Sequence, residues 1–173
     1  LPRGRAGWGI LDSMLTLAER YNLVRWNPGR ASALAESHFL TLHLPERGAS
    51  FWVRYALLRP GTGHGDPTGA LWAVWSHVSG ERRAGCDVLP AVECAAGSHR
   101  FFLRVGSGEI SMGRSIGRLD SAGLSWDLTW ETGTPTLTHL PLPAMYPGTM
   151  PRFKRVSPHV TTRFYGHVRI DGR

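Results

Sequence analysis

Charged and aromatic side chains on two neighbouring predicted strands are the first candidates for a chemical role. Glu36 and His38 lie on one strand, and Trp52 and Arg54 lie on the next. Arg54 sits between apolar neighbours, and a guanidinium that passes a buried layer needs a carboxylate or an aromatic ring beside it. Glu36 and Arg54 can therefore form a structural ion pair, lie on a solvated outer face, or line a pocket.

The register of these two strands decides whether Glu36 meets Arg54. If paired positions sum to an even number, Glu36 shares a face with Trp52 and Arg54. An odd sum places it with Tyr55 and Arg59 instead, because a one-residue slip turns every side chain to the other face. The sequence leaves both registers open. A role for Glu36 as a general acid would also require burial to raise its pKa.

Tryptophan is abundant, with seven residues in 173. Trp72 and Trp75 are three apart in one predicted strand and must point to opposite faces, whereas Trp126 and Trp130 share a face. Aromatic walls suit a cavity for an apolar ligand. They equally suit a plain core or a sheet face that a second domain covers.

Titratable groups and thiols give no motif for a metal or cofactor. His38 and His77 can line a pocket, act as acid–base groups near neutral pH, or be structural. Cys86 and Cys94 stand eight apart without a CxxC pair or a histidine at zinc-finger spacing. We expect free, half-buried thiols, with a disulfide across the turn at Pro90 as the alternative under oxidising conditions. We expect neither a metal nor a cofactor.

The net charge is +7, from 20 basic and 13 acidic residues, and Lys154 is the only lysine. The arginines are spread along the chain without a recognition motif, which indicates GC-rich codon usage and predicts no nucleic-acid partner. No segment approaches the roughly 18 apolar residues of a membrane span, and none resembles a signal peptide. We therefore expect a cytoplasmic domain. The chain starts at Leu1 and not at a methionine, which leads us to expect a trimmed N-terminus.

The elements that position these residues are predominantly strands. Residues 1–8 predict a loose lead-in, and apolar spacings of three and four predict a helix over 9–24, before Asn27-Pro28-Gly29. From about residue 36 the pattern alternates. The expected strands are 37–44, 51–58, 70–78, 84–89, 100–105, 109–112, 115–120, 124–131 and 160–170.

Short loops between these strands predict an all-β fold, an antiparallel meander closed as a barrel or strongly curved as a sheet. The stretch 135–158 holds six prolines and predicts an extended loop. Asp171-Gly172 follows the last strand and is the strongest short hairpin signal. We expect a return strand after it, and hence a chain cut within a hairpin.

Several segments resemble a known family. They are Glu36-Ser37-His38-Phe39-Leu40, Phe51-Trp52-Val53-Arg54-Tyr55, Ala70-Leu71-Trp72-Ala73-Val74-Trp75, Leu124-Ser125-Trp126-Asp127-Leu128-Thr129 and Phe164-Tyr165-Gly166-His167-Val168. Their order and spacing resemble the N-terminal half of the bacterial AttH and hydroxyneurosporene synthase (carotenoid hydratase) family. The resemblance implies a lipocalin-like β domain over 9–173, with a second such domain as its missing C-terminal partner. The acid–base residues proposed for the hydratases belong to that second half.

Three functions follow as hypotheses. The first is a domain that binds an apolar small molecule (an isoprenoid, polyene or lipid) and is not catalytic alone. The second is part of a hydratase (a lyase) or a polyene cyclase. The third is a structural half that packs a tryptophan-rich face on its partner domain. The candidate ligand-binding residues are Glu36, His38, Trp52, Arg54, Tyr55, Trp72, Trp75 and Trp126.

Overall fold

The computed structural model describes residues 17–133, 135–146 and 153–173. Its first element is helix α2, Leu17–Asn22. The predicted lead-in and residues 9–16 of the predicted helix lie outside the described residues. The helix ends at Asn22, two residues earlier than predicted, and the Asn27-Pro28-Gly29 turn follows, in which the Asn27 side chain accepts a hydrogen bond from the Gly29 N–H at 3.1 Å.

Four long strands form an antiparallel meander in the order β1-β2-β3-β4. The strands are β1 Leu34–Leu44, β2 Ala49–Arg59, β3 Thr68–His77 and β4 Arg82–Pro90. The 3-10 turn η1, Pro45–Arg47, joins β1 to β2 and ends at Gly48, whose φ of +58° lies in the left-handed region that glycine favours. The first strand begins three residues before its predicted start at residue 37.

A second antiparallel sheet has the order β12-β9-β8-β7-β6-β5. Its strands are β5 Cys94–Ala96, β6 Phe102–Val105, β7 Gly108–Ser111, β8 Arg114–Leu119, β9 Leu124–Trp130 and β12 Phe164–Ile170. The turns η2 (Ala91–Glu93) and η3 (Asp120–Ala122) precede β5 and β9. The predicted up-and-down connection therefore holds within each sheet, with one insertion between β9 and β12.

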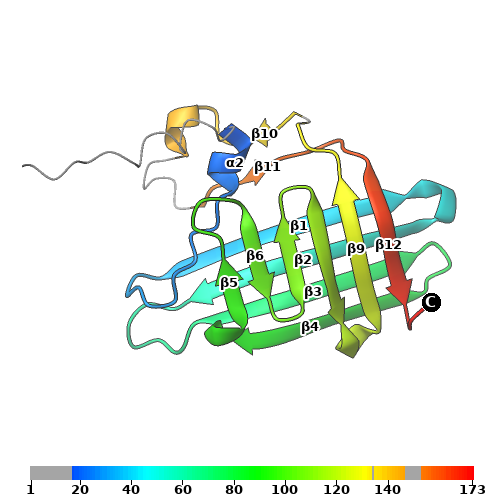
Figure 1. Cartoon of the computed structure of the whole chain (residues 1–173), viewed down its shortest axis with the longest axis horizontal. Helices are drawn as coiled ribbons and strands as arrows, with labels where there is room; N and C mark the ends of the chain where they lie inside the picture. Colours follow the sequence, from blue (N-terminus) through cyan, green and yellow to red (C-terminus); the bar gives the residue numbers. More distant parts are fainter. Residues whose placement is uncertain (1–16, 134, 147–152) are drawn as a thin grey trace, which may run out of the picture.

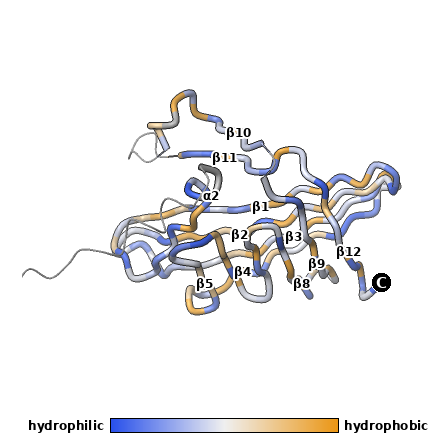
Figure 2. The backbone as a smooth tube through the Cα atoms, turned by 45° about the horizontal axis from the view of Figure 1, so that its top comes forward, coloured by the Kyte–Doolittle hydropathy of each residue, from blue (hydrophilic) through white to orange (hydrophobic). Residues whose placement is uncertain are grey.

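That insertion contains the proline-rich stretch, and its described parts are more ordered than the predicted extended loop. Strands β10 (Leu137–Thr138) and β11 (Val156–Ser157) pair, and η4 (Pro143–Met145) lies between them. The Tyr146 hydroxyl donates to the Arg155 carbonyl at 2.8 Å, and the Tyr146 ring stacks on Tyr21 of α2 with centroids 4.4 Å apart. These elements lie above β1 in both ribbon views (Figures 1 and 2).

The two large sheets pack face to face, with the strands of the four-stranded sheet running crosswise behind the six-stranded one (Figure 1). Alternate residues of each strand fill the space between them, as the alternation in β9 predicts. The largest fully buried side chains are Trp126, Tyr55, Phe51, Leu57, Leu71, Leu103, Leu119 and Leu124. The fold is thus predominantly β and antiparallel, as predicted.

The two sheets do not close into a barrel. Strands β1 and β12 are edge strands: among the described residues, β1 pairs only with β2 and β12 pairs only with β9. The other edge of each strand is therefore left unpaired. Close approach between the sheets depends on glycine at Gly108 of β7, because a Cβ there would lie 2.8 Å from Cδ1 of Leu71 in β3 and 2.9 Å from Cε1 of Tyr55 in β2. The sheets therefore enclose a filled core, and the unpaired edges of β1 and β12 leave an open seam beside it.

The end of β12 forms the hairpin turn that Asp171-Gly172 predicts. Both residues have positive φ, +50° and +77°, the signature of a type I′ turn. The N–H and C=O groups of Ile170 and Arg173 exchange two hydrogen bonds of 3.0 Å, and the Asp171 N–H donates to the Gly123 carbonyl at 2.8 Å. No helix in the described residues is long and apolar enough to cross a membrane.

Candidate functional site

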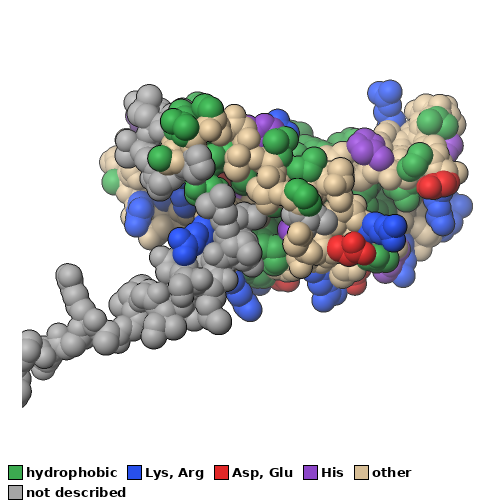
Figure 3. Space-filling model, turned by 90° about the horizontal axis from the view of Figure 1, so that it is seen from above, with side chains coloured by type: hydrophobic (Ala, Val, Ile, Leu, Met, Phe, Trp, Pro, Cys, Tyr) green, Lys and Arg blue, Asp and Glu red, His purple; other side chains and the backbone are tan. Residues whose placement is uncertain are grey.

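An open cleft of about 1,250 Å³ follows the seam between β1 and β12. Its floor is apolar and comes from the inward faces of both sheets: Leu40, Leu42, Leu44, Phe51, Trp75, Phe101, Ile110, Met112, Leu128, Trp130, Phe164, Val168 and Ile170. Its rim is polar and includes Ser37, Thr41, His43, Ser157, Thr162 and His167. Figure 3 looks down on this side of the molecule, where apolar side chains show between polar ones.

The β1–β2 register settles the position of Glu36. Glu36 pairs with Leu57 and Leu34 pairs with Arg59, so paired positions sum to an odd number. Glu36 therefore faces inward with Tyr55 and Arg59, and it does not meet Arg54. An ion pair between Glu36 and Arg54 is excluded because the two side chains point to opposite sides of the sheet.

The buried guanidinium belongs to Arg59, which is 3% exposed, whereas Arg54 is exposed. Arg59 donates to the carbonyl of Asn27, to the carbonyl of Ser32 at 2.6 Å and to the Ser32 hydroxyl at 3.2 Å. Backbone carbonyls thus take the place of the expected carboxylate. Arg59 fixes the 27–32 loop that leads into β1.

Trp52, Arg54 and Trp72 lie together on the outer face of the four-stranded sheet. Arg54 pairs with Trp72 across β2 and β3, and Trp72 is 42% exposed. None of the three lines the cleft. Trp75 points the other way, packs against the core and lines the cleft, so the prediction that Trp72 and Trp75 occupy opposite faces is confirmed.

Tyr55 and Trp126 belong to the filled core rather than to the cleft lining. The Tyr55 hydroxyl lies 2.9 Å from both the Glu109 carbonyl and the Ser115 hydroxyl, and the Trp126 indole N–H donates to the Ser115 oxygen at 3.0 Å. Burial raises the pKa of Tyr55 far above its ordinary value. This network joins the two sheets through polar atoms that water does not reach.

His38, like His77, is a titratable residue that the sequence analysis singled out and that lines the cleft. Its side chain is 10% exposed, and its Nε2 is buried with no hydrogen-bond partner in the described chain. Its ring packs on Phe101 with centroids 5.1 Å apart. The Glu36 carboxylate lies 3.8 Å from Nε2, which is an ion-pair distance and too long for a hydrogen bond.

Glu36 is held ionised by its neighbours. Burial alone would raise its pKa, but the nearby His38, the hydrogen bond from the Arg25 N–H at 2.8 Å and the positive charge of Arg25 together lower the pKa below its ordinary value. A general acid needs the opposite shift. Glu36 is therefore suited to bind or orient a cation or a donor, not to give up a proton at neutral pH.

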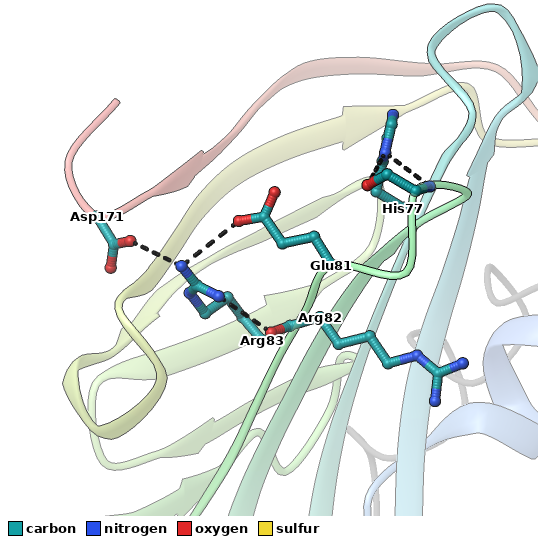
Figure 4. Close-up of polar contacts among 6 residues, drawn as sticks. His77, Glu81, Arg82, Arg83 and Asp171 are labelled. Carbon is teal, nitrogen blue, oxygen red and sulfur yellow. Dashed lines mark hydrogen bonds and ion pairs between the residues drawn. The ribbon is translucent and has the colours of Figure 1, made fainter.

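An ion pair joins the sheets at the other end of the seam, between Arg83 and Asp171 (Figure 4). Arg83 of β4 extends between Glu81 and Asp171, with Nη2 3.4 Å from a carboxylate oxygen of each. The nearby His77 accepts from the Ser79 N–H through Nδ1 at 3.1 Å, and its ring stacks with Trp75. This cluster fixes the terminal turn of β12 against β4, and His77 completes the cleft wall beside it.

Sequence reasoning missed the segment that borders the cleft between β11 and β12. Pro158 to Arg163 line one side of the cleft, although the sequence predicts a strand from Val160. The strand begins only at Phe164, because the chain turns at His159, where φ is +58°. A histidine after proline was the available signal for this turn, but histidine adopts positive φ only occasionally.

Cys86 and Cys94 are both free and half-buried. Burial and neighbouring carboxylates raise the pKa of each thiol. Among the residues that the structure describes, no group of three or more His, Cys, Asp or Glu side chains is arranged to hold a metal ion.

The fold and the cleft define a class of protein: a two-sheet antiparallel β protein with an apolar cleft along one open seam. Comparison with models of known protein families, with curated proteins and with solved structures finds no match. The geometry of the chain itself therefore carries the functional argument.

Proposed function

We propose that this chain binds an apolar small molecule, such as an isoprenoid, a polyene or a lipid, in the cleft between β1 and β12. The observation that carries the proposal is the apolar floor of a cleft of about 1,250 Å³. Ligand sites are concave and mostly apolar, with a few polar groups that orient the ligand. His38, whose Nε2 lacks a hydrogen-bond partner, is such a group at the wall of the cleft.

The resemblance of the strand segments to the AttH and hydroxyneurosporene synthase family supports the same proposal, because that family is lipocalin-like and includes proteins that act on long polyenes. We propose a lipocalin-like relationship on this basis. The open seam departs from a closed lipocalin barrel and gives a long ligand a route of entry along β1.

The test is a titration of the full chain with two polyene probes, retinol and cis-parinaric acid, followed by probe fluorescence and calorimetry. We expect saturable binding of one probe per chain. Trp75→Ala, which removes an aromatic wall, and Met112→Glu, which places a carboxylate at the cleft, should each weaken binding about tenfold, or about 1.4 kcal/mol.

Matched controls lie outside the cleft. Trp72→Ala changes the same residue type on the same strand but on the opposite face, and Val78→Glu adds the same charge at another exposed turn. Both should bind the probes as the wild type does. Failure of both probes to bind, or equal weakening by the controls, would refute the proposal.

The buried His38–Glu36 pair favours a second candidate, a hydratase or cyclase acting on a polyene. Adding water to a C=C bond requires one carbon to gain a proton and a base to take a proton from the attacking water. An imidazole beside an ionised carboxylate can exchange such protons. Incubating the chain with lycopene in detergent micelles tests this candidate: we expect a product heavier by one water with the wild type and none with His38→Gln, and an unchanged substrate rejects it.

A further inference from the structure

The outer face of the four-stranded sheet is apolar where a solvated sheet face is normally polar. Outward positions on β1 to β4 carry Phe39, Trp52, Leu58, Trp72, Val74 and Val88. Leu58 is 51% exposed, Trp72 is 42% exposed and Val88 is 67% exposed. An antiparallel sheet with one face in water normally alternates apolar inside with polar outside. We call this surface the outer face of β1–β4.

The outward face of the six-stranded sheet, in contrast to the outer face of β1–β4, is polar. Its outward positions carry charged residues of both signs: Arg114 forms an ion pair with Asp127 at 3.2 Å, and Arg169 of β12 is exposed. Tyr165, also outward, donates its hydroxyl to Glu131 at 2.7 Å. The apolar character of the outer face of β1–β4 is therefore specific to that sheet and does not follow from a general lack of charge.

The charges on the outer face of β1–β4 have one sign. Its described strand positions carry Arg54 near the centre and Arg82 at one end, and no Asp or Glu. Arg54 makes no ion pair with any described carboxylate. A second copy of the chain seated on this face would bring guanidinium groups together with no carboxylate to pair them. A partner that matches this face in polarity and charge would therefore have an apolar surface that also carries negative charge.

We propose that the outer face of β1–β4 docks on the surface of an anionic lipid membrane. Tryptophan favours the headgroup region, where its ring is buried and its N–H stays wet. Arg54 can lay its apolar stem along the acyl boundary and keep its guanidinium at the phosphates. The overall charge of +7 adds attraction at a distance.

The position of the cleft agrees with this orientation. Phe39, Thr41 and His43 belong to the outward positions of β1 and also line the cleft. The cleft therefore opens along the same strand that borders the docking face. Membrane docking would place its mouth beside the acyl chains, but the docking itself needs no ligand and stands independently of the proposed ligand binding.

The experiment is flotation of the ligand-free full chain with vesicles of mixed phosphatidylglycerol and phosphatidylcholine, and with vesicles of phosphatidylcholine alone. We expect binding to the anionic vesicles that falls as salt is added. Vesicles that contain brominated lipid should quench tryptophan emission, and Trp72→Phe should reduce that quenching while Trp75→Phe should not.

Three variants locate the contact. Trp52→Ser combined with Trp72→Ser should weaken binding at least about tenfold. Arg54→Glu changes two unit charges at the surface and should weaken binding to anionic vesicles about thirtyfold. Arg169→Glu makes the same charge change on the other sheet and is the matched control. Circular dichroism confirms that each variant folds.

Each outcome decides the proposal. Binding that the face variants weaken and Arg169→Glu leaves largely intact supports it. Absence of vesicle binding overturns it, as does equal weakening by Arg169→Glu, which would mean attraction by net charge alone. An oligomer that Trp72→Ser disperses, without vesicle binding, would show that the face is a protein interface and would also overturn it.

Discussion

Replacing Ser115 with alanine tests whether the polar network between the sheets stabilises the fold. The Ser115 oxygen accepts the Trp126 indole N–H at 3.0 Å and lies 2.9 Å from the Tyr55 hydroxyl. All three side chains are almost fully buried. In the variant, Trp126 keeps a buried donor with no acceptor, whereas Tyr55 can still donate to the Glu109 carbonyl.

The magnitude follows from which group loses its partner. A buried donor left unsatisfied costs about 1–3 kcal/mol, so Ser115→Ala should lower the free energy of unfolding by about 2 kcal/mol. Tyr55→Phe removes the donor itself and leaves the Ser115–Trp126 bond in place, so it should cost about 1 kcal/mol. For a chain of this size, 2 kcal/mol corresponds to a fall in Tm of about 4–8 °C.

The assay is urea unfolding followed by tryptophan fluorescence, with Tm from circular dichroism as a second measure. Ser125→Ala in β9 is the control, because it makes the same change at an outward position and should stay within about 0.5 kcal/mol of the wild type. A Ser115→Ala variant as stable as that control, or a Tyr55→Phe variant that is less stable than Ser115→Ala, would refute the reasoning.

Three further predictions concern packing, pH and thiol chemistry. Gly108→Ala places a Cβ 2.8 Å from Cδ1 of Leu71 on the facing sheet and should lower the free energy of unfolding by about 1–3 kcal/mol in urea; an unchanged midpoint would show that the sheets can separate freely. Because the folded pKa of Glu36 is lowered, the stability that its charge contributes is present above the unfolded pKa of about 4.3 and is lost as pH falls through the folded pKa. The Tm difference between the wild type and Glu36→Gln should accordingly shrink on acidification, and a difference that grows would contradict the assignment. The raised pKa of Cys86 and Cys94 predicts slow labelling by a disulfide reagent at neutral pH and faster labelling as pH rises; rates equal to those of free cysteine would be inconsistent with it.

The predominantly β fold was predictable because its signals are local. Alternation of Leu124, Trp126, Leu128 and Trp130 is a period-two pattern, and the structure buries all four side chains in β9. The type I′ turn at Asp171-Gly172 was predictable for the same reason. Such a turn needs two consecutive residues that can adopt positive φ, and this depends on the identity of those two residues alone.

The candidate site was less predictable because it depends on pairing between strands. The local sequence around Glu36 is compatible with either register, and only the odd pairing sum places it inside and Arg54 outside. The three-residue strand β5 carries too few residues for any periodicity. The seam between β1 and β12 joins elements more than 100 residues apart, and no local pattern reports such a contact.

The short η1 turn has a consequence for how this sequence can change. Deleting one residue between Leu44 and Ala49 would make the β1–β2 pairing sum even, so one strand would have to invert its faces or form a bulge. Inversion of β1 would bury Phe39 and turn both Glu36 and His38 out of the interior. We therefore expect the turn to tolerate a change in length of two residues but not of one. Whether its length is odd or even constrains the sequence as strictly as any single side chain does.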